Sequence, residues 1–391
     1  MTQIRLFLFT VMLSAIFAIT PFSTDLYLPA LSEMASDFDV HITLVQQSLS
    51  LFFAGYGVGM FLFGPLIDHF GRRQFVIGGL LIFSIASLLA ALTNNITWFL
   101  LLRFLQAFAG AAATVAIPGY IKALYGKNTP KGMSYFNLIM MLAPLIAPAI
   151  GSLVMTWGQW HLIFVLLAVY AGVILLLAYM YLRVDNEKQQ LNTNKLSFFK
   201  NYRIVFSKKG AKLDILTSFF ASFAFFCYIT DSSFVFMQVF GLSKYTFSLV
   251  FASNVVMLIS ASFINGRLLG RYRVAWLLGA ANVFALCFAS GLVVVNILSL
   301  NVVFTLVTLL PFMGCLWMMS INADSIVLMK FKKEVGTASA VIGTLKFGSA
   351  ALSGPLLALF HSGTAVPFSV LLLGAVILAC ISQVMNYFLK H

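Results

Sequence analysis

The sequence predicts an all-α membrane protein with twelve transmembrane helices, arranged as two halves of six helices each. Three observations support this fold class. Of the 391 residues, 61% are hydrophobic and only 9% are charged, a composition that soluble domains do not have. Long apolar runs recur from one end of the chain to the other, and basic residues gather in every second connection between them.

Twelve apolar runs reach the length of about 20 residues that a spanning helix needs. Each is followed by a short polar connection, except that a longer polar stretch separates the sixth run from the seventh. The runs are 4–33, 43–66, 74–93, 97–122, 132–156, 161–183, 213–238, 246–266, 274–294, 300–329, 336–359 and 365–389.

The basic residues predict the topology. With a cytoplasmic N-terminus, 21 of the 24 Lys and Arg residues fall on the cytoplasmic side, and only Lys244 falls on the other. The remaining two, Arg103 and Lys346, lie inside predicted helices. The positive-inside rule then predicts that both termini are cytoplasmic. The net charge of +13 is therefore interpreted as a topology signal and not as a nucleic-acid-binding patch.

The longest connection, 184–211, is polar and basic. We predict that it is a cytoplasmic linker between an N-terminal six-helix bundle at 1–183 and a C-terminal six-helix bundle at 212–391. Phe198 and Phe199 would let part of the linker lie on the membrane as an amphipathic helix, because basic residues favour anionic lipid. A plain flexible linker explains the composition equally well.

Asp25 is an ionisable residue near the end of the first apolar run. A charge inside a spanning segment costs on the order of 3 kcal/mol on insertion scales, so Asp25 needs a partner or a function. At ~1.5 Å per residue along each helix, Arg103 of the fourth run lies at a similar depth. A nearby guanidinium favours the ionised carboxylate, so a change in their separation would change the affinity for a proton. We expect a proton-coupling pair; a hydrated Asp25 or a permanent ion pair are the alternatives.

Three further charges, Asp231, Asp324 and Lys346, lie in runs of the second half. Their depths favour an Asp324–Lys346 ion pair, with Asp231–Lys346 as the alternative. Thr230-Asp231 also echoes Thr24-Asp25, as expected of a transporter built from repeats. For each uncharged candidate, a helix–helix hydrogen bond is favoured over a contact with substrate. The substrate-cavity candidates are Tyr27, Gln46, Asn137, Asp231, Gln238, Asn254, Asp324 and Lys346.

The connection after the second run reads Gly64-Pro-Leu-Ile-Asp68-His-Phe-Gly71-Arg72-Arg73. Glycines permit a tight turn, Asp68 can accept backbone N–H bonds at a helix N-terminus, and the arginines hold the loop at the cytosolic face. Such a loop can favour one conformation over another. It resembles the signature cytoplasmic loop of the major facilitator superfamily, with His69 in place of an Arg and Lys122 where an acidic partner is usual. The switch residues expected from it are Gly64, Asp68, Gly71, Arg72 and Arg73.

The fifth run contains Ala143-Pro144-Leu-Ile-Ala147-Pro148-Ala-Ile-Gly151. The prolines interrupt helix hydrogen bonds, and small residues allow a neighbouring helix to approach closely. The run resembles the antiporter motif of proton-coupled drug exporters, with Ala-Pro in place of Gly-Pro. An ordinary kinked, closely packed helix is the alternative.

The stretch Thr24-Asp-Leu-Tyr-Leu-Pro-Ala-Leu31 gives the most specific resemblance. With Ala143-Pro144 and Gly336-Thr-Ala-Ser-Ala340, it resembles the bicyclomycin-resistance (Bcr/CflA) branch of drug:proton antiporters, most closely in the first half. The resemblance implies the major facilitator fold, export of small molecules in exchange for protons across a bacterial inner membrane, and Asp25 and Arg103 as the proton-coupling residues.

Together these features predict a proton-coupled secondary transporter that exports drugs or metabolites by alternating access. Proton-coupled or facilitative uptake of a small polar solute is the nearest alternative. A membrane-embedded enzyme is disfavoured because the chain has no HExxH, GxSxG or P-loop motif and its five His are scattered. The expected partners are a small-molecule substrate, protons and the lipid bilayer, without nucleic acid, metal or cofactor. We expect a monomer driven by the proton gradient.

Overall fold

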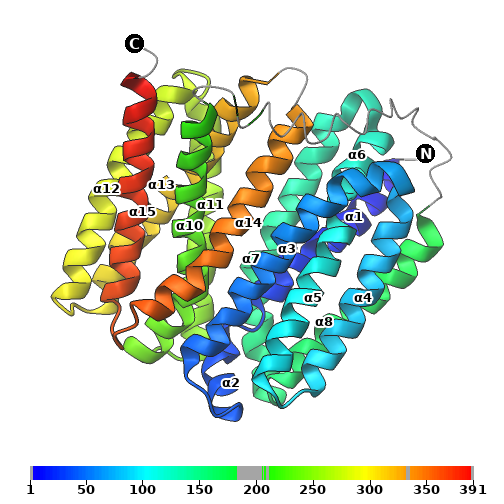
Figure 1. Ribbon diagram of the computed structural model, residues 1–391, viewed down its shortest axis with the longest axis horizontal. Coiled ribbons are helices and arrows are strands. Elements are labelled where there is room, and N and C mark those ends of the chain that lie inside the picture. The colour runs from blue at the N-terminus through cyan, green and yellow to red at the C-terminus, as the bar shows by residue number, and fades with distance from the viewer. Residues whose placement is uncertain (1–2, 183–204, 206, 208–210, 332–334, 389–391) are drawn as a thin grey trace. The chain divides into compact units, whose positions relative to one another are not determined.

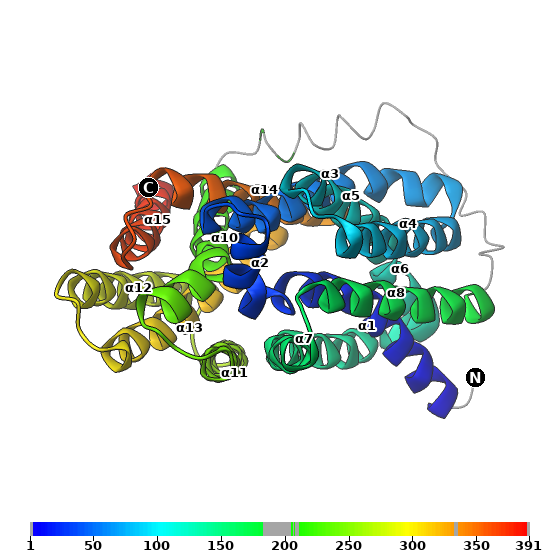
Figure 2. The same ribbon diagram turned by 90° about the horizontal axis from the view of Figure 1, so that it is seen from below.

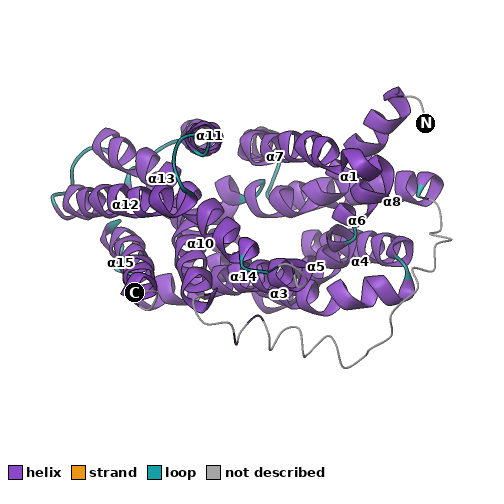
Figure 3. Ribbon diagram, turned by 90° about the horizontal axis from the view of Figure 1, so that it is seen from above, coloured by secondary structure: helices purple, strands orange, loops and turns teal. Residues whose placement is uncertain are grey.

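The computed structural model describes residues 3–182, 205, 207, 211–331 and 335–388. All regular structure in these ranges is helical (Figure 3). The chain divides into two compact units, Met1–Thr193 and Asn194–His391, which contain α1 to α8 and α10 to α15 respectively (Figure 1). The amphipathic helix considered around Phe198 and Phe199 lies outside the described residues.

In the first unit, the first and fourth apolar runs are each broken into two helices. Pro29 and Pro118 stand at the start of the new helical piece, where a residue without an N–H is tolerated because that donor would have no intrahelical acceptor. The elements are α1 (Gln3–Asp25), η1 (Leu28–Ala30), α2 (Leu31–Asp37), α3 (Ile42–Phe70), α4 (Arg72–Leu92), α5 (Ile96–Val115), α6 (Ile117–Tyr125), η2 (Gly126–Asn128), α7 (Thr129–Trp157) and α8 (His161–Tyr181).

In the second unit, the seventh run ends in a π-helical turn. The elements are α10 (Ala211–Ser233), the π-helix η3 (Phe234–Val239), α11 (Lys244–Leu268), α12 (Val274–Ile297), α13 (Val302–Met329), α14 (Val335–Leu359) and α15 (Val366–Phe388). α10 packs against α13, α14 and α15, so it is the central helix of this unit and most of its side chains are buried.

Each predicted run contains a long helix. Within the described residues, eleven helical segments are long and apolar enough to cross a membrane. The remaining run is α7, whose apolar stretch, Leu142–Trp157, is shorter. The predicted all-α membrane fold is therefore confirmed.

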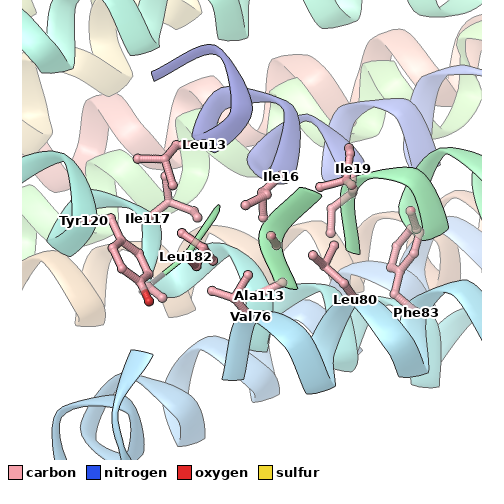
Figure 4. Close-up of a cluster of buried hydrophobic side chains, with 14 of the residues drawn as sticks. Leu13, Ile16, Ile19, Val76, Leu80, Phe83, Ala113, Ile117, Tyr120 and Leu182 are labelled. Carbon is pink, nitrogen blue, oxygen red and sulfur yellow. The ribbon is translucent and has the colours of Figure 1, made fainter. Parts of the chain in front are cut away.

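The core of the first unit lies between α1, α4, α5 and α6 (Figure 4). Leu13, Ile16 and Ile19 recur every three residues along α1, so they lie on one side of the helix, and they belong to the same buried cluster as Val76 and Leu80 of α4. Figure 2 shows α1 alongside α7 and α8, against which it also packs. These contacts place the end of α1 inside the bundle.

Candidate functional site

Asp25 is the last residue of α1 and only 3% of it is exposed. The Thr24 hydroxyl donates a hydrogen bond to Asp25 Oδ1 at 2.8 Å. The α-helix stops at this point and a short 3-10 helix follows at Leu28. The first run therefore presents a buried carboxylate at a break in the helix, where a negative charge is costly.

Arg103 lies on α5 and is fully buried. Its Nη2 donates to the backbone oxygen of Ser23 at 2.8 Å, and its Nη1 donates to Gln106 Oε1. Gln106 Nε2 in turn donates to Ser87 Oγ on α4 at 2.6 Å. The last carbonyls of a helix have no intrahelical donor, and Ser23 is in the final turn of α1, so the guanidinium caps that end.

Aromatic rings surround the same guanidinium. Its central carbon lies 4.6 Å from the ring centroid of Tyr27, 4.5 Å from that of Phe52 and 5.5 Å from that of Phe164. The Tyr27 hydroxyl is fixed by Ser48 Oγ at 2.8 Å. Cation–π contacts are strongest where water is excluded, so this cage holds Arg103 in one position.

No ion pair joins Asp25 to Arg103 in the described part of the chain. The Ser23 contact instead brings the guanidinium to the level of α1 two residues before Asp25. The permanent ion pair considered from the sequence is therefore not the arrangement found here. The guanidinium of Arg103 bonds instead to the backbone oxygen of Ser23 and to the side chain of Gln106.

The α7 helix touches the break after Asp25. Pro144, Pro148 and Gly151 all lie within α7, and a Cβ atom added at Gly151 would overlap the backbone oxygen of Leu26. Only a residue without a side chain permits this approach of the two backbones. The helix that resembles the antiporter motif thus contacts the residue next to Asp25.

Gly71 ends α3 and forms the turn into α4. Its φ of +90° is a conformation that favours glycine, and its N–H bonds to the backbone oxygen of Ile67 at 3.1 Å. Gly64 lies within α3 with open space where a Cβ would be. The side chain of Asp68 lies outside the described residues.

The two arginines after this turn reach different helices. The guanidinium carbon of Arg72 lies 6.0 Å from the ring centroid of Tyr120 on α6. Arg73 donates to the backbone oxygens of Leu182 at 2.7 Å and Tyr179 at 3.0 Å. Arg73 therefore caps the C-terminal end of α8, where the helix dipole favours a cation.

In the second unit, Lys346 of α14 forms an ion pair with Asp324 of α13. Lys346 Nζ also donates to Ser320 Oγ at 2.8 Å, and Ser218 Oγ of α10 donates to Asp324 Oδ1 at 2.6 Å. The favoured pairing is confirmed, and the alternative pairing of Lys346 with Asp231 is wrong. Asp231 is buried in α10.

The other cavity candidates differ in exposure. Gln46 and Asn254 are each 2% exposed, and within the described residues neither amide atom of Asn254 has a hydrogen-bond partner. Gln238 is exposed in the π-helical turn. The side chain of Asn137 lies outside the description.

One buried network was missed by the sequence reasoning. Asp214 of α10 forms an ion pair with Lys330, and Asn386 Nδ2 donates to Asp214 Oδ1 at 2.6 Å. Lys330 follows the tenth apolar run, where the sequence predicts a cytoplasmic connection and no ion pair. The hydrogen bond between Arg103 and Gln106, by contrast, could have been predicted from the sequence. Gln106 follows Arg103 by three residues, and residues three apart share a helix face.

Helices of membrane-spanning length with charged residues buried in their spans indicate a multi-pass membrane protein in which those charges have a function. Residues 13–355 match the Major Facilitator Superfamily, and the chain belongs to this family. The prediction that it is not an enzyme is therefore confirmed. Transporters of this family generally need no cofactor, and within the described residues no group of His, Cys, Asp or Glu could hold a metal ion.

Two relatives and one solved structure are similar to this chain. The chain is 30% identical to the "Bicyclomycin resistance protein homolog" of Haemophilus influenzae, covering 98% of this chain and 96% of the relative. It is 28% identical to a "Chloramphenicol resistance protein" of Pseudomonas aeruginosa, covering 92% and 87%. A bacterial homologue of the human lysosomal transporter Spinster superposes with a TM-score of 0.74 at 14% identity, over 98% of this chain and 96% of that one. The last likeness supports the fold alone, whereas the first confirms the resemblance to the bicyclomycin-resistance branch.

Proposed function

We propose that this transporter exports small molecules across a bacterial inner membrane in exchange for protons, with Asp25 as the proton-binding carboxylate. The observation that carries the proposal is the position of Asp25, buried at the end of α1 with Thr24 as its hydrogen-bond donor. The carboxylate stands beside a helix break that Gly151 of α7 contacts through Leu26. A bend at that break would change the surroundings of Asp25 and hence its affinity for a proton.

In this proposal Arg103 is the positive charge whose distance from Asp25 sets the proton affinity of that carboxylate. Its bond to Gln106 and its contact with Phe52 hold the guanidinium to α5 and α3, so a movement of the end of α1 that breaks the Ser23 bond would change the distance between the two charges. Binding of substrate would favour the state in which Asp25 releases its proton. Alternating access then couples the outward passage of substrate to the inward passage of a proton.

The names of the two relatives support a drug-like substrate. The distribution of basic residues supports cytoplasmic termini, and we propose that the chain works as a monomer with two six-helix bundles at 1–183 and 212–391 joined by the linker at 184–211. The loop residues Gly64, Asp68, Gly71, Arg72 and Arg73 serve in the proposal as the conformational switch.

Everted membrane vesicles with an acidic interior test the direction and the coupling of transport. We expect the wild type to accumulate labelled chloramphenicol inside them and to release protons from the interior, and we expect Asp25→Asn to reduce both by at least about tenfold. Asp37→Asn is the matched control, because Asp37 accepts a hydrogen bond from Trp160 at the end of α2 and is not part of the proposed proton site. This variant should transport normally.

Equilibration of chloramphenicol without accumulation, at a rate that does not depend on the pH gradient, would support facilitative transport instead. Chloramphenicol leaving the vesicles together with protons would support uptake. Equal coupled export by wild type and Asp25→Asn would contradict the assignment of the proton to Asp25.

A further inference from the structure

The second unit contains an accessible ion pair. Ser218, Ser320, Asp324 and Lys346, the charge cluster, join α10, α13 and α14 through the ion pair and two serine hydrogen bonds. About a fifth of each charged side chain stays exposed, 24% for Lys346 and 21% for Asp324. Asp25, in contrast, is 3% exposed. A solute can therefore reach the charge cluster more easily than it can reach the proton site.

The charge cluster retains hydrogen-bonding capacity. A lysine ammonium has three N–H donors, and within the described residues Lys346 directs its bonds to Ser320 and Asp324 only. A carboxylate offers about four acceptor positions, and Asp324 accepts one bond from Ser218 and one from Lys346. Each charge can thus bind a further group of opposite charge without losing the serine contact.

Four partly exposed aromatic residues, the aromatic chain, link the same three helices. The ring centroids of Phe347 and Phe226 lie 5.8 Å apart, those of Phe226 and Phe225 5.4 Å, and those of Phe225 and Trp317 6.0 Å. Trp317 Nε1 donates to Ser262 Oγ at 2.6 Å, which fixes the indole. The aromatic chain therefore forms an apolar surface from α14 through α10 to α13.

On α10 and on α13, a member of the charge cluster and a member of the aromatic chain lie on the same helix face. On α10, Phe225 follows Ser218 by seven residues, and on α13 Asp324 follows Trp317 by seven. Seven residues are almost two turns, so each pair shares a helix face at a separation of about 10 Å. On α14, Phe347 directly follows Lys346. A small aromatic molecule matches this span.

The ion pair also lies far from the helix end. Lys346 is eleven residues from Val335, about 16 Å along α14, which is near the middle of a spanning helix. An exposed ion pair facing lipid at that depth would be strongly unfavourable. We therefore expect the exposed parts of Asp324 and Lys346 to face water and not lipid.

We infer that the charge cluster and the aromatic chain bind an aromatic zwitterion, with its carboxylate on Lys346, its ammonium on Asp324 and its ring on the aromatic chain. The pair is neutral overall, so a zwitterion matches both charges, whereas a singly charged molecule would match only one of them. This inference rests on the proposed export function and names its substrate class.

Tryptophan and two analogues test the charge requirement directly. Tryptamine lacks the carboxylate and indole-3-propionate lacks the ammonium, while all three carry the same ring. Binding to the full-length protein in detergent is measured by isothermal titration calorimetry. We expect tryptophan to bind about tenfold or more tightly than either analogue, because each analogue can pair with only one of the two charges. Equal affinities, or no binding of tryptophan up to its solubility limit, would overturn the inference.

Variants locate the preference in the charge cluster. Lys346→Met and Asp324→Asn should each abolish the advantage of tryptophan, whereas Lys346→Arg keeps the cation and should retain it. Lys212→Met, at an exposed lysine at the start of α10, is the control that should bind as the wild type does. Monodisperse elution of each variant excludes misfolding. An unchanged preference in Lys346→Met would place the zwitterion elsewhere.

Asp25→Asn separates this inference from the proposed function. The variant should bind tryptophan with the wild-type preference while it no longer releases protons. If zwitterion selectivity is present but the wild type itself releases no proton, the recognition site stands and the proton-exchange proposal fails. If the wild type releases protons but does not prefer tryptophan to its analogues, the proton-exchange proposal stands and the zwitterion inference fails.

Discussion

Replacing Arg103 by methionine is expected to abolish transport and to lower the thermal stability of the purified protein. The guanidinium is fully buried and donates to Ser23 and Gln106, and the latter holds Ser87. A hydrogen bond from a charged group contributes about 1.5–3 kcal/mol, and the acceptors left behind would remain buried without a donor. We expect a loss of about 3 kcal/mol or more in the free energy of unfolding.

The measurement is the melting temperature in detergent together with chloramphenicol transport in vesicles. Arg271→Met, at an exposed arginine between α11 and α12, serves as the control and should behave like the wild type. Arg103→Lys keeps the charge but not the planar guanidinium that donates to two acceptors, so it should recover stability only in part. Wild-type stability and transport in Arg103→Met would show that the caged guanidinium is dispensable.

Adding a single methyl group at Gly151 is expected to separate α7 from the break in the first span. A Cβ atom there would overlap the Leu26 oxygen and lie 2.8 Å from the Leu26 carbonyl carbon. Both are backbone atoms, so the clash cannot be relieved by rotating a side chain. Overpacking of this kind costs about 1–3 kcal/mol, and it would also displace the residue that follows Asp25.

Gly78→Ala is the matched control for Gly151→Ala. Gly78 lies inside α4 with open space where the Cβ would be, so alanine there should be neutral or stabilising by about 0.5–1 kcal/mol through the helix backbone. Melting temperature and transport are measured for both variants. Wild-type values for Gly151→Ala would mean that close contact between α7 and Leu26 is not required.

The sequence was sufficient for the helices and for one of the charge pairs. Apolar runs of spanning length predict helices because no other single segment satisfies its backbone in lipid, and within the described residues each of the twelve runs contains a helix. The Asp324–Lys346 pair followed from depth alone, since the rise per residue of a helix is fixed. Both inferences use properties local to a single helix.

The contacts of Arg103 show what the sequence could not predict. The expected neighbour was the Asp25 carboxylate, whereas the guanidinium bonds to the Ser23 backbone and is surrounded by Tyr27, Phe52 and Phe164. These rings come from three distant segments of the chain, and no spacing in the sequence relates them. Every residue has a backbone oxygen, so the residue type of Ser23 does not mark it as an acceptor for Arg103. Predicting that bond requires knowing where α1 ends.

Substrate-induced proton release tests the central claim most directly. Purified protein in weakly buffered detergent solution near neutral pH is titrated with chloramphenicol and, separately, with bicyclomycin, for the wild type and for Asp25→Asn. The account predicts acidification on substrate binding to the wild type and none with the variant, although the variant still binds substrate. Proton release that persists in Asp25→Asn would contradict it, because the exchanged proton would then be bound by another residue.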